Sequence, residues 1–168
     1  MRWTINHGDI LDEPADILVC SANVYLNLSG GVGGALLLRY GDQMQQELRR
    51  YLLDRDVNFV RQGEVVACGP CGTPYKAVLH AVAVDVFYQS SSVVIRATVR
   101  EALRQAAVLG ARKVALAAVG TGYGRLTMQE FAQGILPLLG QDVPPVEEVV
   151  VCVRNPQDAQ ELSASLPL

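Results

Sequence analysis

The stretch ADILVCSANVYLNLSGGVGGALLLRY, residues 15–40, runs from an apolar segment through a glycine-rich segment into a region of helical periodicity. Residues 15–20 are mainly apolar, which is typical of a short strand buried on both faces of a sheet. Four of the five residues 30–34 are glycine, so the backbone there can approach a ligand closely. A helix that begins behind such a loop offers unpaired N–H groups and a positive dipole end to an anion. The stretch therefore predicts an α/β protein with a loop suited to a diphosphate, and a glycine turn without a ligand is the alternative.

A second glycine-rich segment, GTGYG at residues 120–124, follows another apolar run that ends at Val119. In α/β proteins, ligands bind beyond the carboxyl ends of the strands, and both glycine segments come after strand-like runs. We therefore expect the two loops to face each other across one cleft and to hold both phosphates of a ligand, with the Tyr123 ring against a sugar. The alternative is that this loop only ends a strand.

Strand-like and helical segments alternate along the rest of the chain, and no linker or internal repeat divides it. Apolar residues at helical spacing from Leu36 to Tyr51 indicate one long amphipathic helix, and a further helix ends at Gly110. The capping box at residues 127–130 and the cap residue Asn155 mark the starts of two more helices. Strands are expected at residues 2–6, 15–20, 64–68, 77–84, 113–119 and 147–153.

This alternation predicts one domain, residues 1–168, with a three-layer α/β/α sandwich as its architecture. The segment CGPCGTP, residues 68–74, is rich in turn residues and predicts a hairpin between two strands. We expect antiparallel pairing both at this hairpin and at the N-terminal strand. The sheet is therefore predicted to be mixed, with about six strands and about four helices in the whole chain.

Composition and charge favour a small ligand over nucleic acid. Half of the residues are apolar, only 18% are charged, and the formal net charge is −3. Duplex nucleic acid requires clustered Lys and Arg, and no such cluster is present. The N-terminal residues lack the apolar core of a signal peptide, and no window approaches the roughly 20 apolar residues of a membrane span. We expect a cytoplasmic protein without membrane contact, and no metal site, because only one C-x-x-C pair is available as ligands.

The tetrapeptide Cys68-Gly69-Pro70-Cys71 is the dithiol motif that thioredoxin-like proteins use in redox chemistry. A redox C-x-x-C needs a helix N-terminus behind the second cysteine to lower its thiol pKa. Here the chain continues through residues 72–74, Gly-Thr-Pro, into an apolar strand. We interpret the tetrapeptide as part of the hairpin turn and keep a thiol oxidoreductase as an alternative.

Five short motifs, in this order, resemble those of the macrodomain family, which binds ADP-ribose. They are GDI at 8–10, VCSAN at 19–23, GGVGGA at 30–35, LHAV at 79–82 and GTGYG at 120–124. The combination extends over nearly the whole chain and is more specific than any single motif. The resemblance implies a mixed six-stranded sheet between helices, no cofactor, and ADP-ribose or an ADP-ribosylated protein as the partner. It implies no particular oligomeric state.

The resemblance also implies roles for single residues. Asp9 matches the acid that accepts a hydrogen bond from the adenine amino group, and Ile10 lines the base pocket beside it. Asn23 matches the asparagine near the distal ribose and is the one catalytic candidate, while Arg154 or Asn155 matches the position over the adenine. The ligand contacts implied in full are Asp9, Ile10, Ala22, Asn23, Gly30, Gly31, Val32, Gly33, Gly34, Thr121, Gly122, Tyr123, Gly124 and Arg154.

Several of these residues have a purely structural alternative. Asp9 can be a solvated turn residue, and Asn23 can hold its own loop by bonding to the backbone. Arg154 can stack on a base, or it can be a solvated residue at the end of a strand. His80, within the LHAV motif, fits a core histidine better than a catalytic base.

The departures from the family pattern concern catalysis. Hydrolases of the family commonly carry an Asp before the last glycine of the first loop, and this chain has Gly33 there. No side chain evident from the sequence then serves as a general base, so hydrolysis would depend on Asn23 and a water polarised by the ligand's own phosphate. We therefore expect ADP-ribose binding, with weak hydrolysis of ADP-ribosyl or O-acetyl-ADP-ribose substrates as a second hypothesis and a purely binding module as the alternative. RNA binding in the same cleft is not expected, because the chain is acidic.

Overall fold

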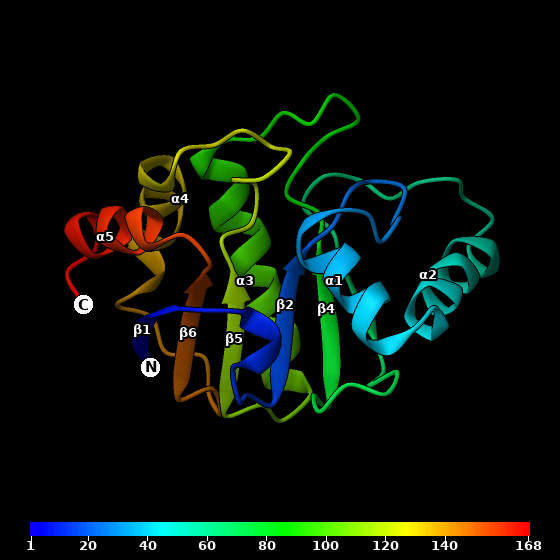
Figure 1. Ribbon diagram of the computed structural model, residues 1–168, viewed down its shortest axis with the longest axis horizontal. Helices are drawn as coiled ribbons and strands as arrows, with labels where there is room; N and C mark the ends of the chain where they lie inside the picture. The colour runs from blue at the N-terminus through cyan, green and yellow to red at the C-terminus, as the bar shows by residue number, and fades with distance from the viewer.

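The computed structural model describes residues 1–168 without a gap, and its strands and helices alternate along the chain (Figure 1). The elements are β1 (Arg2–His7), η1 (Ile10–Asp12), β2 (Ile17–Ser21), α1 (Gly31–Tyr40), α2 (Gln43–Asp54), β3 (Val65–Cys68), β4 (Ala77–Ala81), α3 (Ser92–Val108), β5 (Lys113–Ala117), α4 (Met128–Ile135), η2 (Leu136–Leu138), β6 (Glu148–Val153) and α5 (Pro156–Ser165). The elements η1 and η2 are single 3-10 turns.

The six strands form one mixed sheet in the order β1-β6-β5-β2-β4-β3, which confirms the predicted sheet. Only β3 runs antiparallel, and it pairs with β4 across the predicted hairpin. The prediction of antiparallel pairing at the N-terminal strand is wrong, because β1 pairs parallel with β6, Trp3 opposite Val149. The two strands lie at opposite ends of the chain, so no tight turn joins them and forces the antiparallel direction.

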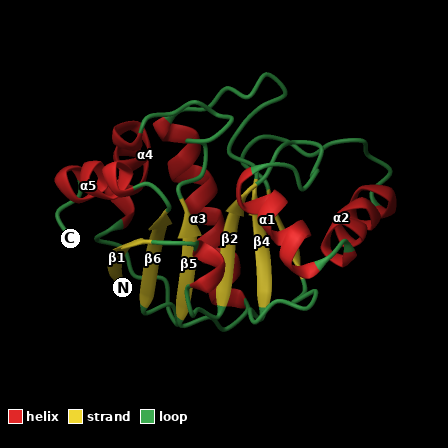
Figure 2. Ribbon diagram, viewed as in Figure 1, coloured by secondary structure: helices red, strands yellow, loops and turns green.

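The helices cover both faces of the sheet and complete the three-layer sandwich (Figure 2). The helices α1 and α2 contact β2 and β3 respectively, α3 contacts β3 and β4, and α5 contacts β1 and β6, while α4 packs between α3 and α5. The central strands are buried on both faces, and residues 17–20 of β2 are fully buried. A strand that is covered on both faces has apolar residues at successive positions, and this continuous apolar run is why the strand could be predicted from the sequence.

The predicted long helix after the first glycine loop is wrong, because the structure has two helices there. Gly41 adopts φ 81° and donates its N–H to the carbonyl of Leu37, which ends α1. A left-handed glycine at this position is a common helix terminator. The apolar spacing continues across the break, since Leu36 of α1 and Leu48 of α2 both belong to the core. The chain therefore has five α-helices.

The local start signals of the later helices are confirmed. Thr127 and Glu130 form a reciprocal capping box at the start of α4. Asn155 caps α5 by accepting a hydrogen bond from the N–H of Gln157 at 2.9 Å. Side chains that satisfy the first N–H groups of a helix fix its starting residue, so these positions are readable from sequence.

Both glycine loops lie at the carboxyl edge of the sheet, as predicted. Figure 1 shows the arrowheads of β2 and β6 pointing to the edge at which the long loops gather. The first loop leaves the end of β2 and enters α1, and the second leaves the end of β5. Because β2 and β5 are parallel neighbours, the two loops begin side by side. None of the helices combines the length and the apolar composition that a bilayer crossing requires.

Candidate functional site

A cavity of about 500 Å³ opens at the carboxyl edge of the sheet, between the two glycine loops. It extends across the ends of β6, β5, β2 and β4, which is about 14 Å at the usual strand spacing. This volume is within the usual range for small-ligand sites. The residues that line it are Ser21, Ala22, Asn23, Asn27, Ser29, Gly30, Gly31, Val32, Gly33, Ala83, Val84, Tyr88, Ala117, Ala118, Gly120, Thr121, Gly122, Tyr123, Gly124, Met128, Cys152, Val153, Arg154 and Asp158.

The cavity contains most of the residues named from the sequence. Ala22, Asn23, Gly30–Gly33, Thr121–Gly124 and Arg154 all line it. Asp9, Ile10 and Gly34 do not. Ile10 is 4% exposed and belongs to the core, and Gly34 lies in the first turn of α1, behind the lining residues.

The first glycine loop presents unpaired backbone donors to the cavity. Gly30 precedes α1 with φ 58°, and no side chain caps the helix. The N–H groups of Gly31, Val32 and Gly33 make no hydrogen bond within the protein, whereas that of Gly34 donates to the carbonyl of Gly30. These three donors are the free N-terminal groups of a helix and carry its positive dipole end.

The second glycine loop is tightly folded and also leaves donors free. Gly120 adopts φ 84°, and a Cβ on Gly124 would lie 2.3 Å from the carbonyl oxygen of Gly120, so only glycine fits there. The hydroxyl of Thr121 donates to the carbonyl of Ala118 at 2.7 Å and holds the turn. The N–H groups of Gly122, Tyr123 and Gly124 make no hydrogen bond within the protein. Six unpaired N–H groups from two loops therefore belong to residues that line one cavity.

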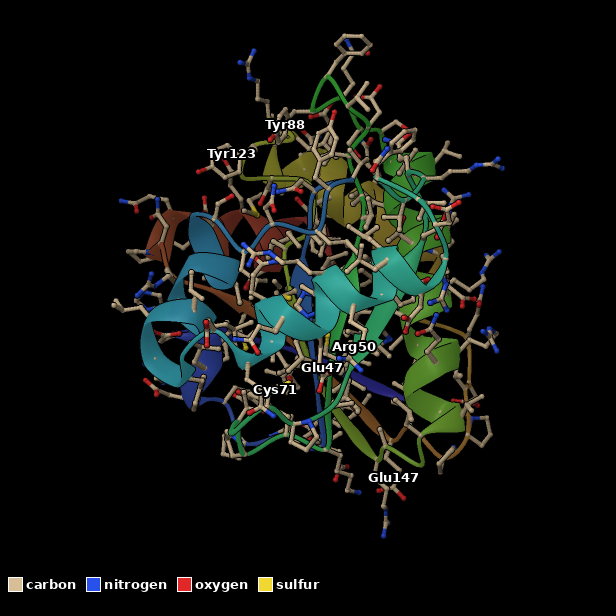
Figure 3. All side chains as sticks on the ribbon, turned by 90° about the vertical axis from the view of Figure 1, so that its right-hand side faces the viewer. Glu47, Arg50, Cys71, Tyr88, Tyr123 and Glu147 are labelled. Atoms are coloured by element: carbon tan, nitrogen blue, oxygen red, sulfur yellow. The ribbon has the colours of Figure 1, made fainter.

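Tyr123 joins the two loops and a third loop across the cavity. A Cβ on Gly30 would lie 2.2 Å from the Tyr123 hydroxyl, so this phenol occupies the space that the glycine leaves. The ring of Tyr88, from the loop between β4 and α3, lies 5.8 Å from that of Tyr123 between centroids. Figure 3 shows Tyr88 and Tyr123 together at the end of the molecule opposite Glu147. Tyr88 was not predicted from the sequence, although the aromatic segment Val86-Phe87-Tyr88 just beyond a strand was a usable signal.

The Asn23 side chain is engaged by its own loop. Its Oδ1 accepts hydrogen bonds from the N–H groups of Tyr25 at 3.0 Å and Asn27 at 3.2 Å. Its Nδ2 donates to the carbonyl of Asn27 at 3.1 Å. The amide therefore holds residues 23–27 in shape, and one Nδ2 hydrogen is left for a ligand.

Asp9 lies outside the cavity and beneath two arginines. Its Oδ1 accepts from the N–H of Leu11 at 3.0 Å, while its Oδ2 lies 3.4 Å from Arg39 and 3.3 Å from Arg154. Arg39 also pairs with Asp12 at 2.7 Å. Arg154 lines the cavity with a side chain that is 72% exposed, so it can leave the carboxylate at little cost. Arg39, which lies in the last turn of α1, was not predicted from the sequence.

His80 and Cys20 are buried side by side in the sheet and do not line the cavity. They are paired in register between β2 and β4, and Nδ1 of His80 lies 3.4 Å from the Cys20 Sγ. The Nε2 of His80 has no partner, and burial lowers the pKa of this ring to about 4. Burial also raises the pKa of Cys20 to about 12. His80 is thus a neutral core residue at physiological pH.

The C-x-x-C segment lies away from the cavity, in the turn between β3 and β4 at the amino edge of the sheet. Both cysteines are free and buried. Burial, with the Glu47 carboxylate beside them, raises the pKa of Cys71 to about 11 and that of Cys68 further. Glu47 also accepts a hydrogen bond from the N–H of Gly69 at 3.0 Å. These effects oppose thiolate formation, which thiol redox catalysis requires.

Few ionisable side chains line the cavity. Asp158 and Arg154 lie at the β6 end, and the β4 end has the phenols of Tyr88 and Tyr123. No cluster of three or more His, Cys, Asp or Glu in the chain is arranged to hold a metal ion. The arrangement can bind an anion through backbone donors, but no carboxylate or imidazole lines the aromatic end of the cavity.

Comparison with known proteins agrees with this geometry. The family model described as Macro domain matches residues 19–135. A macro domain-containing protein of Streptomyces griseus is 34% identical over 145 residues, which cover 84% of this chain and 81% of that relative. An Oceanobacillus iheyensis macrodomain with ADP superposes with a TM-score of 0.84 at 22% identity, covering 96% of this chain and 87% of the other. A Trypanosoma brucei macrodomain in complex with ADP-ribose superposes with a TM-score of 0.81 at 20% identity, covering 96% and 68%.

Proposed function

This chain belongs to the macrodomain family, and on that premise we propose that its cavity binds ADP-ribose, either free or attached to a protein. The observation that carries the proposal is the convergence of unpaired backbone donors. The N–H groups of residues 31–33 and 122–124 make no bond within the protein and belong to cavity-lining residues. Because amides at a helix N-terminus and in a glycine loop suit phosphate oxygens, a diphosphate between the loops would satisfy both sets.

At the β6 end of the cavity, we assign the adenine to Asp9 and Arg154. Arg154 now pairs with Asp9 from an exposed position. When it moves onto the face of the base, the Asp9 Oδ2 keeps its 3.4 Å contact with Arg39 and can accept a hydrogen bond from the adenine amino group in place of the one from Arg154. Ile10 does not line the cavity, so its part in the base pocket is to support Asp9 from the core.

At the β4 end, we assign the distal ribose to Tyr123, Tyr88 and the free Nδ2 hydrogen of Asn23. The phenols and the amide can bond to ribose hydroxyls, but none is a general base at neutral pH. We therefore propose that the protein binds ADP-ribose with, at most, slow hydrolysis. An O-acetyl-ADP-ribose or ADP-ribosyl ester would be cleaved only by a water that the ligand's phosphate orients.

Calorimetry with ADP-ribose on the wild-type protein and on Asp9→Asn tests the binding proposal. The asparagine keeps an oxygen that can cap Leu11 but removes the negative acceptor for the adenine amino group. Asp12→Asn is the matched control, since Asp12 also pairs with Arg39 but lies outside the cavity. We expect Asp9→Asn to weaken binding about tenfold, the scale of one charge-assisted hydrogen bond, and Asp12→Asn to leave it unchanged.

No heat of binding with the wild-type protein would refute the proposal. An equal loss of ADP-ribose affinity in both variants would show that Asp9 acts by positioning Arg39 and not by binding the adenine. The same proteins can be assayed for release of ADP-ribose from a glutamate-linked ADP-ribosyl peptide. Asn23→Asp keeps an acceptor for the loop and introduces a carboxylate at the distal ribose, so we expect it to release ADP-ribose at least tenfold faster than the wild type.

A further inference from the structure

The most exposed aromatic side chain of the molecule, Phe87, lies in the loop that supplies Tyr88 to the cavity. Phe87 is 78% exposed, and Val86 beside it is 44% exposed. No ring–ring contact within the protein involves Phe87, whereas Tyr88 packs on Tyr123. Val86, Phe87 and Tyr88 are three consecutive exposed apolar residues, and a run of exposed apolar side chains beside a binding cavity is a common mark of an interaction surface.

The structure holds this loop in a defined shape. The Asp85 carboxylate accepts hydrogen bonds from the N–H groups of Phe87 at 2.8 Å and Gln89 at 2.9 Å. The Gln62 side chain donates to the carbonyl of Gln89 at 2.8 Å and ties the loop to the segment before β3. Phe87 is therefore presented outward by a tethered turn.

Tyr88 connects this exposed surface with the cavity. It adopts φ 60°, a strained conformation for a residue with a side chain, and in this conformation its ring lies against Tyr123. Tyr88 is 42% exposed and Tyr123 is 63% exposed, yet both line the cavity. Phe87, Tyr88 and Tyr123 are called the aromatic rim below: Tyr88 and Tyr123 line the cavity, and Phe87 is exposed directly before Tyr88 in the chain.

The charges near the rim favour a polypeptide as its occupant. Residues 77–95 contain no Lys or Arg, and Asp85 is their one carboxylate, while Arg125 is exposed two residues beyond Tyr123. A nucleic acid, a poly(ADP-ribose) chain or an anionic membrane would require a cluster of basic residues, and one arginine beside one carboxylate is not such a cluster. An aromatic surface with so few charges matches the apolar and backbone groups of a peptide, because aromatic side chains are the preferred anchors of protein interfaces.

We propose that the aromatic rim docks the polypeptide to which the ADP-ribose is attached, with Phe87 as its main anchor. The inference rests on the proposed binding of ADP-ribose, because the bound nucleotide would bring the polypeptide chain to the β4 end of the cavity. The protein then recognises ADP-ribosylated proteins more strongly than free ADP-ribose. Phe87, which does not line the cavity, contributes affinity for the protein part of the ligand and none for the nucleotide part.

Calorimetry with two probes tests this: free ADP-ribose, and a ten-residue peptide that carries ADP-ribose through a non-hydrolysable linkage. We expect the wild-type protein to bind the modified peptide at least tenfold more tightly than free ADP-ribose. Phe87→Ser should remove that difference without changing the affinity for free ADP-ribose. Leu53→Ser, at a leucine of α2 that is also 78% exposed and does not line the cavity, is the matched control and should change neither.

The outcomes separate this inference from the proposed function. If free ADP-ribose and the modified peptide bind with equal affinity, the proposed role of the rim is wrong and the proposed function stands. The role of the rim is also wrong if the Phe87→Ser protein still prefers the modified peptide, or if the protein binds a single-stranded RNA through Phe87. Absence of binding to either probe would overturn both. Thermal unfolding of Phe87→Ser should match the wild type, because the side chain is already in water.

Discussion

The two edges of the sheet use their polar groups in opposite ways. At the amino edge, the Asp16 carboxylate accepts hydrogen bonds from the N–H groups of Arg112 at 2.8 Å and Lys113 at 3.0 Å and pairs with Lys76 at 2.8 Å. In the same region Arg112 pairs with Glu147. At the carboxyl edge, the amides of residues 31–33 and 122–124 in the two glycine loops make no bond within the protein.

The same contrast holds between two helices that begin at the carboxyl edge. At α4 a complete capping box satisfies the N–H groups of Thr127 and Glu130, whereas α1 begins after Gly30 without any side-chain cap. A helix cap normally stabilises a protein by about 1 kcal/mol. The donors that the fold leaves unused at the start of α1 belong to residues that line the cavity and are available to a ligand, and this comparison is the physical basis of the proposed function.

The strongest test of the comparison is a charge placed among the free amides. A Cβ on Gly122 would meet nothing within 4 Å, and Gly122 lines the cavity. Gly122→Asp should therefore leave thermal stability unchanged but weaken ADP-ribose binding at least about a hundredfold, through repulsion of the diphosphate. Gly140→Asp makes the same change in open space outside the cavity. Equal affinity of the two variants, measured by calorimetry, would contradict the placement of the phosphates.

The second test concerns the dithiol at the amino edge. Burial and Glu47 raise the pKa of Cys71 to about 11, two units above the ordinary value of 9.0. The thiolate fraction at pH 7.5 then falls about a hundredfold, and so should the rate of alkylation by iodoacetamide relative to the urea-unfolded chain. Mass spectrometry of the modified cysteine gives the rate. Rapid alkylation of the folded protein, or acceleration of insulin reduction by dithiothreitol, would revive the thiol oxidoreductase alternative.

The third test removes the Asp16 carboxylate, whose two oxygens both have partners at the amino edge of the sheet. Lys76, with the N–H groups of Lys113 and Arg112, lowers the pKa of Asp16 from 3.8 to about 2. The resulting stability is present above pH 3.8 and is lost as the pH falls through about 2. Because the Asp16 side chain is one-quarter exposed, we expect Asp16→Asn to cost about 1–2 kcal/mol at pH 7 and to flatten the stability profile between pH 4 and pH 2.

Urea unfolding over this pH range measures the effect of Asp16→Asn. Its affinity for ADP-ribose should stay at the wild-type value, because Asp16 does not line the cavity. A loss of affinity without a loss of stability would show that the two edges are coupled and that the comparison is wrong.

The smallest expected effect is at the capped helix of the carboxyl edge. The Thr127 hydroxyl accepts a hydrogen bond from the N–H of Glu130 at 3.1 Å, so Thr127→Ala should lower the free energy of unfolding by about 1 kcal/mol. ADP-ribose affinity should not change, since Thr127 does not line the cavity. A gain in affinity would mean that the freed N–H groups of α4 also reach the ligand.

The sequence alone was sufficient to predict those features of the fold that depend on a few neighbouring residues. The buried strand at residues 17–20, the capping box of α4 and the hairpin at CGPCGTP each depend on a few neighbouring residues. The parallel direction of β1 depends on β6, about 145 residues away, and no local pattern encodes it. The end of α1 at Gly41 was hidden because the apolar spacing runs through the break.

The residues of the candidate site likewise divide into those that could be predicted from local sequence and those that depend on remote partners. The glycine loops and Arg154 could be named because their motifs are contiguous, and the structure assembles them around one cavity. Tyr88 and Arg39 were missed because each acts through a partner remote in sequence, Tyr123 and Asp9 respectively. The engagement of Asn23 by its own loop was among the alternatives that the sequence left open, and only the three-dimensional contacts select it.

The central claim is that the free amides of both loops bind one diphosphate. Titration of the ¹⁵N-labelled protein with ADP-ribose tests it directly through the amide resonances. The account predicts that Gly31, Gly33, Gly122 and Tyr123 shift downfield together with a single Kd, while Gly69, already bonded to Glu47, does not move. Shifts confined to one loop, or a ligand that leaves all four amides unchanged, would contradict it.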